Sequence, residues 1–191
     1  GPNLTIHALR GALLGIATAL FFHGLKYLEL ADAISIFFIE PLILTALSTL
    51  FLGEHVGWRR MMAVLVGFSG ALIVIRPSFV SVGWPSLLPV GAAFCFACYL
   101  ALTRHTAVRD YPARMQFFSG LFGCLFMSVL LAIGELAEIP AIRVVEPTLD
   151  QWLAVGLLGL IGTTGHLLVV NAFKLASASL LAPFQYLELV G

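Results

Sequence analysis

Long apolar stretches of about 20 residues alternate with short polar connections along the whole chain. Each complete stretch is close to the length that an α-helix needs to cross the hydrocarbon core of a bilayer. Backbone polar groups in lipid must be satisfied within their own segment, so we expect these stretches to be helices. The pattern predicts seven spans, the last one incomplete, at residues 8–28, 31–53, 58–76, 84–103, 115–134, 151–173 and 177–191.

The composition agrees with this pattern. Of the 191 residues, 60% are hydrophobic and 10% are charged, and the mean hydropathy is +1.03. A soluble domain carries about 25% charged residues, so this chain could not cover a water-facing surface. It is expected to be an all-α integral membrane protein, a multi-span helical bundle with the lipid bilayer as a partner. The net charge of zero gives no reason to expect nucleic acid as another.

The charged residues lie mostly between the apolar stretches and differ in number between the two sides. If the first stretch begins in the cytoplasm, seven cations fall on the cytoplasmic side and three on the other. The positive-inside rule favours this orientation. The seven are Arg10, Arg59, Arg60, Arg104, Arg109, Arg114 and Lys174, and the three are Lys26, Arg76 and Arg143.

The chain contains an internal repeat. Lys26 and Lys174 are 148 positions apart, and so are Glu40 and Glu188. Because charged residues are scarce, two such coincidences in one register indicate a repeat. The first and second stretches match the sixth and seventh, so the repeating unit holds five helices. An odd number of crossings inverts the second copy, which predicts Lys26 outside and Lys174 inside. Inverted repeats are typical of secondary transporters, in which the site lies between the two copies.

Several segments resemble the EamA domain of the drug/metabolite transporter superfamily. In the first half they are residues 10–33, 39–56 and 66–77, and in the second half residues 172–188. The family implies ten helices in two inverted five-helix repeats, of which this chain resembles the third to the ninth. Residues 1–77 are then the C-terminal part of the first repeat, with three helices. Residues 84–191 are the second repeat without its last helix, so the chain is expected to be truncated at both ends.

The resemblance also implies a function. We expect a permease of the bacterial inner membrane that moves a small organic metabolite or drug-like solute by alternating access. Family members commonly transport outward, so an exporter is predicted, with proton coupling as a further hypothesis. The chain is not expected to be an enzyme, and no catalytic residue, cofactor or metal site is predicted. A homodimer is compatible with the sequence.

The residues themselves suggest where a solute could bind. Glu40 lies near the middle of its span and is followed by Pro41, which kinks a helix and frees a backbone carbonyl. A carboxylate at that depth is costly unless it is neutral, paired or hydrated. It could serve the transported solute or proton, or it could bond a neighbouring helix. The full set of predicted substrate-binding residues is Glu40, His166, Gln185, Tyr186 and Glu188.

Three secondary candidates accompany them. His23 and Asn171 occupy equivalent repeat positions, and Thr163 shares a helix face with His166. Packing is the alternative for His23, because it continues a series of small residues with a four-residue spacing that predicts close helix contact. The glycines of the sixth span, with a three-residue spacing, predict the same. The two series are Gly11, Gly15 and Ala19, and Gly156, Gly159, Gly162 and Gly165.

Two other classes of membrane protein share features with this sequence. Gly67-Phe68-Ser69-Gly70 matches the short G-x-S-G pattern of rhomboid intramembrane serine proteases, in which a histidine would activate the serine. A channel or a non-transporting scaffold is the other alternative. The inverted repeat and the midplane carboxylates favour the transporter.

Overall fold

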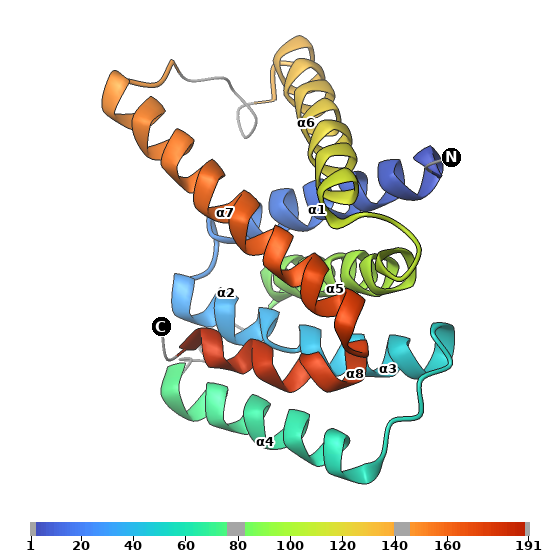
Figure 1. Cartoon of the computed structure of the whole chain (residues 1–191). Helices are drawn as coiled ribbons and strands as arrows, with labels where there is room; N and C mark the ends of the chain where they lie inside the picture. Colours follow the sequence, from blue (N-terminus) through green and yellow to red (C-terminus); the bar gives the residue numbers. More distant parts are fainter. Residues whose placement is uncertain (1–2, 76–82, 140–145, 190–191) are drawn as a thin grey trace.

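A computed structural model of the chain describes residues 3–75, 83–139 and 146–189, and the side chains of all of these except residues 74, 75, 188 and 189. Every regular element in these ranges is helical, as the apolar pattern predicts, and a helical segment occupies each of the seven predicted spans (Figure 1). In chain order they are α1 (Leu4–Gly24), α2 (Leu30–Phe37), α3 (Glu40–Phe51), α4 (Trp58–Ile75), η1 (Trp84–Ser86), α5 (Leu87–Ala107), α6 (Pro112–Leu136), α7 (Leu149–Leu175), α8 (Ala178–Leu181) and η3 (Ala182–Leu189).

Five stretches of the described chain are long and apolar enough to span a bilayer. They are Leu4–Gly24, Leu30–Phe51, Trp84–Ala107, Pro112–Leu136 and Leu149–Leu175. The second combines α2 and α3, which are separated only by a short break at Phe38 and Ile39. The predicted positions of the other two spans are taken by α4 and by the α8–η3 segment.

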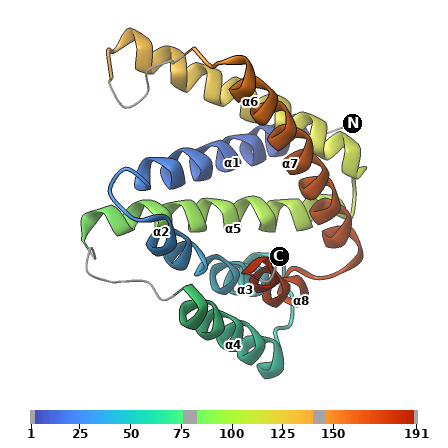
Figure 2. The ribbon, with the colours of Figure 1, turned by 90° about the vertical axis from the view of Figure 1, so that its left-hand side faces the viewer.

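Helix α5 lies at the centre of the bundle because its side chains are small where other helices approach. Ala92, Ala93 and Ala97 are completely buried. Small residues let helix backbones come close without displacing large side chains. Helices α1, α2, α3, α7 and α8 all contact α5, and Figure 2 shows α1 alongside it over most of its length.

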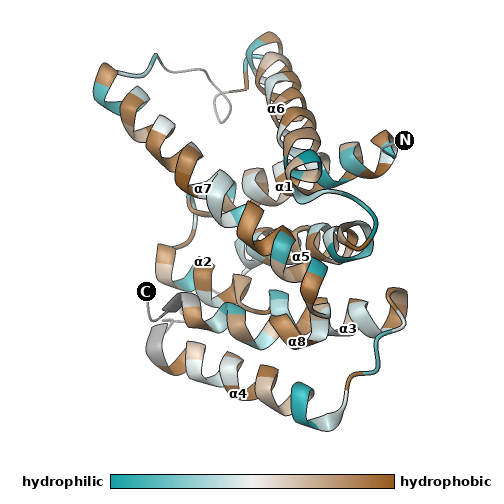
Figure 3. Cartoon of the chain, viewed as in Figure 1, coloured by the Kyte–Doolittle hydropathy of each residue, from teal (hydrophilic) through white to brown (hydrophobic). Residues whose placement is uncertain are grey.

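Glycine packing differs between α1 and α7. A Cβ atom on Gly11 would lie 2.7 Å from the backbone nitrogen of Gly123, and one on Gly15 would lie 2.7 Å from the Phe126 ring. The predicted close contact of α1 is therefore confirmed, with α6 as the partner. The glycines of α7 have nothing within 4 Å of such a Cβ, so the contact predicted there is absent from the described part of the chain. Figure 3 shows apolar residues along α7 where it leaves the bundle.

The two ends of the bundle carry the charges that the repeat predicts. Gly24, close to Lys26, lies against Leu88 and Pro89 at the start of α5. Phe173, next to Lys174, accepts a hydrogen bond from Arg104 near the end of α5. Arg104 follows Leu88 by 16 positions, which corresponds to roughly 24 Å of helix at 1.5 Å per residue. The two lysines therefore lie at opposite ends of α5, as an inverted repeat requires.

Most of the predicted cytoplasmic cations gather at one end, which we call the cation-rich end. It holds the start of α1, α4, α6 and α8 and the end of α3, α5 and α7. Arg10, Arg60, Arg104, Arg114 and Lys174 all make contacts there. Two of the three cations predicted on the other side, Arg76 and Arg143, lie outside the described residues.

Candidate functional site

Equivalent residues of the two repeats meet at the break between α2 and α3. The chain turns at Phe38 and Ile39, and Pro41 then stands near the start of α3. The hydroxyl group of Tyr186 donates a 3.1 Å hydrogen bond to the carbonyl oxygen of Phe38, and their ring centroids are 5.7 Å apart. These residues are 148 positions apart, the same spacing as Lys26 and Lys174. A residue that contacts its own repeat equivalent lies close to the axis that relates the copies.

Three of the predicted site residues lie at or next to this contact between the repeats. Glu40 is only 3% exposed and lies close enough to Tyr186 for its charge to act on the phenol. Gln185 is next in the chain, and its Oε1 atom is buried with no hydrogen-bond partner among the described residues. The side chain of Glu188 lies outside the described part of the structure, so its predicted place beside Glu40 stays a prediction.

A cavity of about 240 Å³ lies on the other side of the break. Phe37, the last residue of α2, lines it, whereas the next residue, Phe38, faces Tyr186. Ring centroids are 5.5 Å apart between Phe21 and Phe37 and 5.7 Å apart between Phe37 and Phe96. We call this space the aromatic cavity. Its lining residues are Leu14, Ala17, Thr18, Phe21, Phe22, Phe37, Phe96 and His166.

His166 is the predicted candidate that reaches the aromatic cavity. Its Nδ1 atom lies 3.3 Å from the hydroxyl oxygen of Tyr99, and its ring contacts the Phe96 ring edge-on at 6.4 Å. Tyr99 is fully buried in α5. The Tyr99 hydroxyl therefore fixes the orientation of the imidazole and leaves Nε2 as the ring nitrogen open to a ligand.

The secondary candidates lie elsewhere. His23 packs edge-on against Tyr27 at the end of α1, with 5.6 Å between ring centroids. Thr163 lines a separate groove between α6 and α7, together with Gln116. Asn171 is exposed and donates to the carbonyl of Leu167 in its own helix. None of the three lines the aromatic cavity.

A first polar cluster joins the two repeats at the cation-rich end. The Glu54 carboxylate accepts hydrogen bonds from the backbone N–H groups of Ala178 (3.1 Å) and Ser179 (3.0 Å) at the start of α8, and from Arg104 (3.2 Å). The Arg104 guanidinium also donates to the Phe173 carbonyl. Arg60 donates to the Ser177 and Ser179 hydroxyls. The Glu54 cluster consists of Glu54, Arg60, Arg104, Ser177 and Ser179.

The environment of Glu54 favours its charged form. Burial alone would raise the pKa of this carboxyl group, but the N–H groups of Ser179 and Ala178, the Ser179 hydroxyl and the Arg104 guanidinium together outweigh it. The pKa of Glu54 is therefore held below its ordinary value. The carboxylate also caps the otherwise unsatisfied N–H groups at the start of α8.

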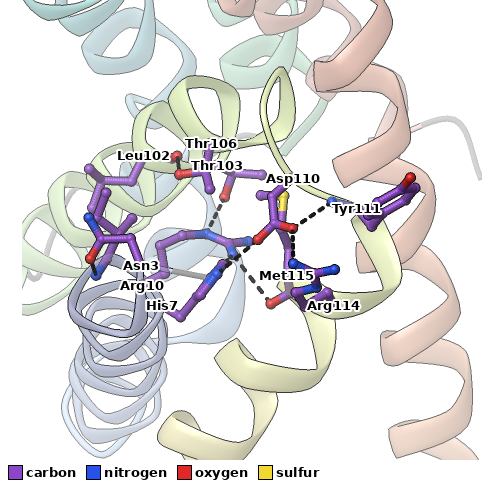
Figure 4. A network of polar contacts seen from close by, with 11 residues as sticks. Asn3, His7, Arg10, Leu102, Thr103, Thr106, Asp110, Tyr111, Arg114 and Met115 are labelled. Atoms are coloured by element: carbon purple, nitrogen blue, oxygen red, sulfur yellow. Dashed lines mark hydrogen bonds and ion pairs between the residues drawn. The ribbon is translucent and has the colours of Figure 1, made fainter. Parts of the chain in front are cut away.

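A second cluster joins α1 to the α5–α6 corner at the same end (Figure 4). We call it the Arg10 cluster, and it consists of His7, Arg10, Thr103, Asp110 and Met115. Arg10 is fully buried and donates to the Thr103 hydroxyl at 3.2 Å and to the Met115 carbonyl at 3.3 Å. His7 contacts Arg10 through one ring nitrogen and Asp110 through the other. The Arg10 guanidinium lies 5.3 Å from the centre of the Tyr99 ring, so it reaches the residue that orients His166.

Sequence reasoning missed the inter-repeat role of these clusters. It treated Arg10, Arg60 and Arg104 as cytoplasmic topology residues and assigned no role to His7, Glu54 or Asp110. The sequence did contain one indication for Glu54, because an acidic residue close to loop arginines is expected to form an ion pair. The partners themselves are 50 to 125 residues away in the sequence and follow only from the tertiary fold.

The protease alternative loses its support in the described structure. Ser69 is exposed and donates to the Leu65 carbonyl of its own helix at 2.9 Å. Gly67, the first glycine of the pattern, faces the Tyr186 ring so closely that a Cβ atom would collide with it. Packing explains this glycine without catalysis.

A family model for the EamA-like transporter family matches residues 3–76 and 83–191. The chain belongs to the EamA-like transporter family. It is therefore an integral membrane protein of the bacterial inner membrane, and the enzyme alternatives no longer apply.

Several curated relatives match nearly the whole chain. It is 29% identical over 187 residues to the S-adenosylmethionine uptake transporter of Rickettsia bellii, which covers 97% of the chain and 60% of that protein. It is 32% identical over 184 residues to the riboflavin transporter of Vibrio cholerae, covering 96% and 59%. The pseudopaline exporter of Pseudomonas aeruginosa is 26% identical over 192 residues, covering 99% and 63%. The chain thus spans about 60% of the length of these relatives.

A solved crystal structure confirms the fold independently of these relatives. It matches with a TM-score of 0.68 and 19% sequence identity, covering the whole of this chain and 76% of the other. At this identity the likeness concerns only the arrangement of the helices.

Proposed function

We propose that the whole protein is a secondary transporter that moves a small organic solute by alternating access. The solute binds in the aromatic cavity, beside the break between α2 and α3. The observation that carries this proposal is the contact between the equivalent residues Phe38 and Tyr186, with the cavity directly next to it. In transporters built from inverted repeats, the site lies where the copies meet and where helices are broken.

The Glu54 cluster and the Arg10 cluster hold the cation-rich end closed in this proposal. Both connect residues of the first repeat to residues of the second. Rocking of one copy against the other must break these hydrogen bonds before the cavity can open to that side. The opposite movement leaves them intact.

Glu40 is the residue proposed to couple transport to protons. It is buried at the break and lies near Tyr186. Substitution by Gln keeps the shape of the side chain and removes the charge, so it should abolish the dependence of transport on pH. Wild-type transport with unchanged pH dependence in Glu40→Gln would contradict the coupling.

The direction of transport is a separate prediction. The relatives include one named for uptake and one named for export, and both align with nearly all of this chain. Outward transport therefore rests on the family resemblance alone. Side-specific loading of proteoliposomes tests it.

The test of the proposed function begins with a screen of small solutes by thermal shift, since a ligand that binds the folded state raises its melting temperature. Solutes that raise the melting temperature are then tested in a counterflow assay in proteoliposomes. His166→Ala is expected to reduce counterflow at least tenfold. Asn171→Ala is the matched control on the same helix, because in the described part of the chain Asn171 bonds only within α7 and lies outside the cavity. Equal counterflow in the two variants would contradict the proposed site.

A further inference from the structure

The lining of the aromatic cavity defines the kind of group that it can hold. Four of its residues are phenylalanines, contributed by α1, α2 and α5: Phe21, Phe22, Phe37 and Phe96. Aromatic rings in proteins prefer edge-to-face or offset arrangements with centroids about 4.5–7 Å apart. The Phe37 ring already lies within this range of both Phe21, edge-on, and Phe96, at a tilt. A flat ring placed among them would meet both faces and edges.

Two of the residues that line the cavity, Thr18 and His166, have polar side chains. The Thr18 hydroxyl donates to the Leu14 carbonyl at 2.9 Å, so toward the cavity it offers only its oxygen lone pairs. His166 has Nδ1 engaged by Tyr99, which leaves Nε2 for the cavity. These two atoms can pair with ring nitrogens or with exocyclic groups of a heterocycle.

No carboxylate, lysine or arginine belongs to the described lining of the cavity. A cation inside would lose its hydration without a counter-charge, and contact with the phenylalanine faces would offset only part of that cost, about 2 kcal/mol. The Arg10 guanidinium behind Tyr99 would add repulsion. An anion would have no charged donor on the lining. The cavity therefore favours a neutral ring over an ionised one.

The size of the cavity sets an upper limit on the ring. The cavity volume is about 240 Å³. Pockets for whole drug-sized ligands occupy about 300–1,000 Å³. The aromatic cavity is thus large enough for one mono- or bicyclic ring system, and the rest of a larger solute must extend beyond it.

From these observations we infer that the aromatic cavity binds an uncharged, planar heteroaromatic ring, stacked among Phe21, Phe37 and Phe96 and hydrogen-bonded to Nε2 of His166. The inference rests on the proposed function, because it names the class of solute for the same site. Tyr99 is a positioning residue, since it acts on the ligand only by orienting His166.

The test uses 2-aminopurine, a neutral bicyclic heterocycle whose fluorescence changes on transfer from water to an apolar site. Titration into the whole protein in lipid nanodiscs should show a saturable change in its fluorescence. Phe96→Leu keeps an apolar side chain but removes a stacking partner, and the apparent Kd should rise about fivefold. His166→Ala should raise it about fivefold through loss of a hydrogen bond, and Tyr99→Phe should raise it less.

Phe117→Leu is the matched control, because Phe117 lines the separate groove between α6 and α7. Its Kd should stay within about twofold of the wild-type value, as expected for a site with no stacking contact to that ring. N-methylquinolinium, a permanently charged bicycle of similar size, should fail to displace the probe. Equal displacement by this cation would overturn the claim that the ring must be neutral.

The outcomes separate the inference from the proposed function. If 2-aminopurine does not bind, or binds equally to wild type, Phe96→Leu and His166→Ala, the ligand class is wrong. The proposed function then still stands if His166→Ala reduces counterflow of a solute found in the screen. If that counterflow is unchanged as well, the site itself is wrong.

Discussion

Helix α1 of the first copy is held by its neighbours much more tightly than its equivalent in the second copy, α7. Gly11 of α1 and Gly159 of α7 occupy equivalent positions, but among the described residues only Gly11 is in close contact with another helix. In their most apolar stretches, 28% of residues are buried in α1 and 6% in α7. The repeat thus reproduces the path of the chain through the membrane without reproducing its packing, which depends on which helices lie next to each copy.

The broken helices of the two copies also share a position in the repeat but differ in local structure. In the first copy, α2 ends at Phe37 and α3 begins at Glu40. In the second, α8 is followed directly by a tighter 3-10 segment that contains Pro183. The details differ, yet Phe38 and Tyr186 meet in space at the same repeat position. Symmetry is therefore closest at the centre, where the copies contact each other, and weakest at the periphery.

The largest effect is expected when alanine replaces each of the two equivalent glycines and the melting temperatures are compared. Gly11→Ala places a Cβ atom against the backbone of Gly123 and Ser119, which cannot move as a flexible side chain can. Overpacking of this kind costs about 1–3 kcal/mol, so the melting temperature in detergent should fall by several degrees. Gly159→Ala should leave the melting temperature unchanged or raise it slightly, because alanine favours helix. Equal effects would contradict the packing difference between the copies.

A second prediction breaks the link between the copies at the cation-rich end. Glu54→Gln weakens the cap on α8 and the pairing with Arg104. Loss of such a cap costs about 0.5–2 kcal/mol, which should shift the population toward opening at this end by up to about 30-fold. Spin labels at Gly57 and Val108, measured by double electron–electron resonance, report the opening.

Arg59→Gln is the control for this experiment. Arg59 is adjacent to Arg60 but contacts only the Trp58 ring among the described residues. It should leave the distance distribution unchanged. A distribution in Glu54→Gln that matches the wild type would show that the Glu54 cluster does not hold this end closed.

The third prediction concerns pH. Because the pKa of folded Glu54 lies below its ordinary value of 4.5, the stabilisation by this carboxylate is fully present above pH 4.5. It is lost as the pH falls through the lowered pKa. The same spin-label distance should therefore stay constant from pH 7 to pH 5 and lengthen only in stronger acid. Glu54→Gln should show no such acid transition, and an opening between pH 7 and pH 5 that Glu54→Gln abolishes would contradict the assignment.

The smallest effect is expected where the copies meet. Tyr186→Phe keeps the ring against Phe38 and Gly67 but removes the hydrogen bond to the Phe38 carbonyl. One such bond contributes about 1 kcal/mol, so a small decrease in melting temperature is expected. Tyr27→Phe is the control, since the Tyr27 ring packs on Trp84 and is half exposed. A Tyr186→Phe variant as stable as Tyr27→Phe would mean that the hydrogen bond contributes nothing.

Much of the fold could be predicted from the sequence because membrane helices reveal themselves locally. The apolar lengths and Lys26 and Lys174 were sufficient to predict seven spans and their alternating direction. The site was harder to predict from the sequence. Glu40 and His166 stood out as polar residues inside spans, but the rings that line the cavity, such as Phe37 and Phe96, are indistinguishable in sequence from lipid-facing phenylalanines. Their role depends on which helix lies opposite, and one sequence does not record this.

The central claim is that two copies of one unit cross the membrane in opposite directions. It is tested most directly by single cysteines at Lys26 and Lys174 of the whole protein, with the native Cys95, Cys98 and Cys124 replaced by alanine. Intact cells and inverted membrane vesicles are labelled with a membrane-impermeant maleimide. The cysteine at position 26 is expected to react only from outside the cell and the one at position 174 only from the cytoplasmic side. Labelling of both from the same side would contradict it.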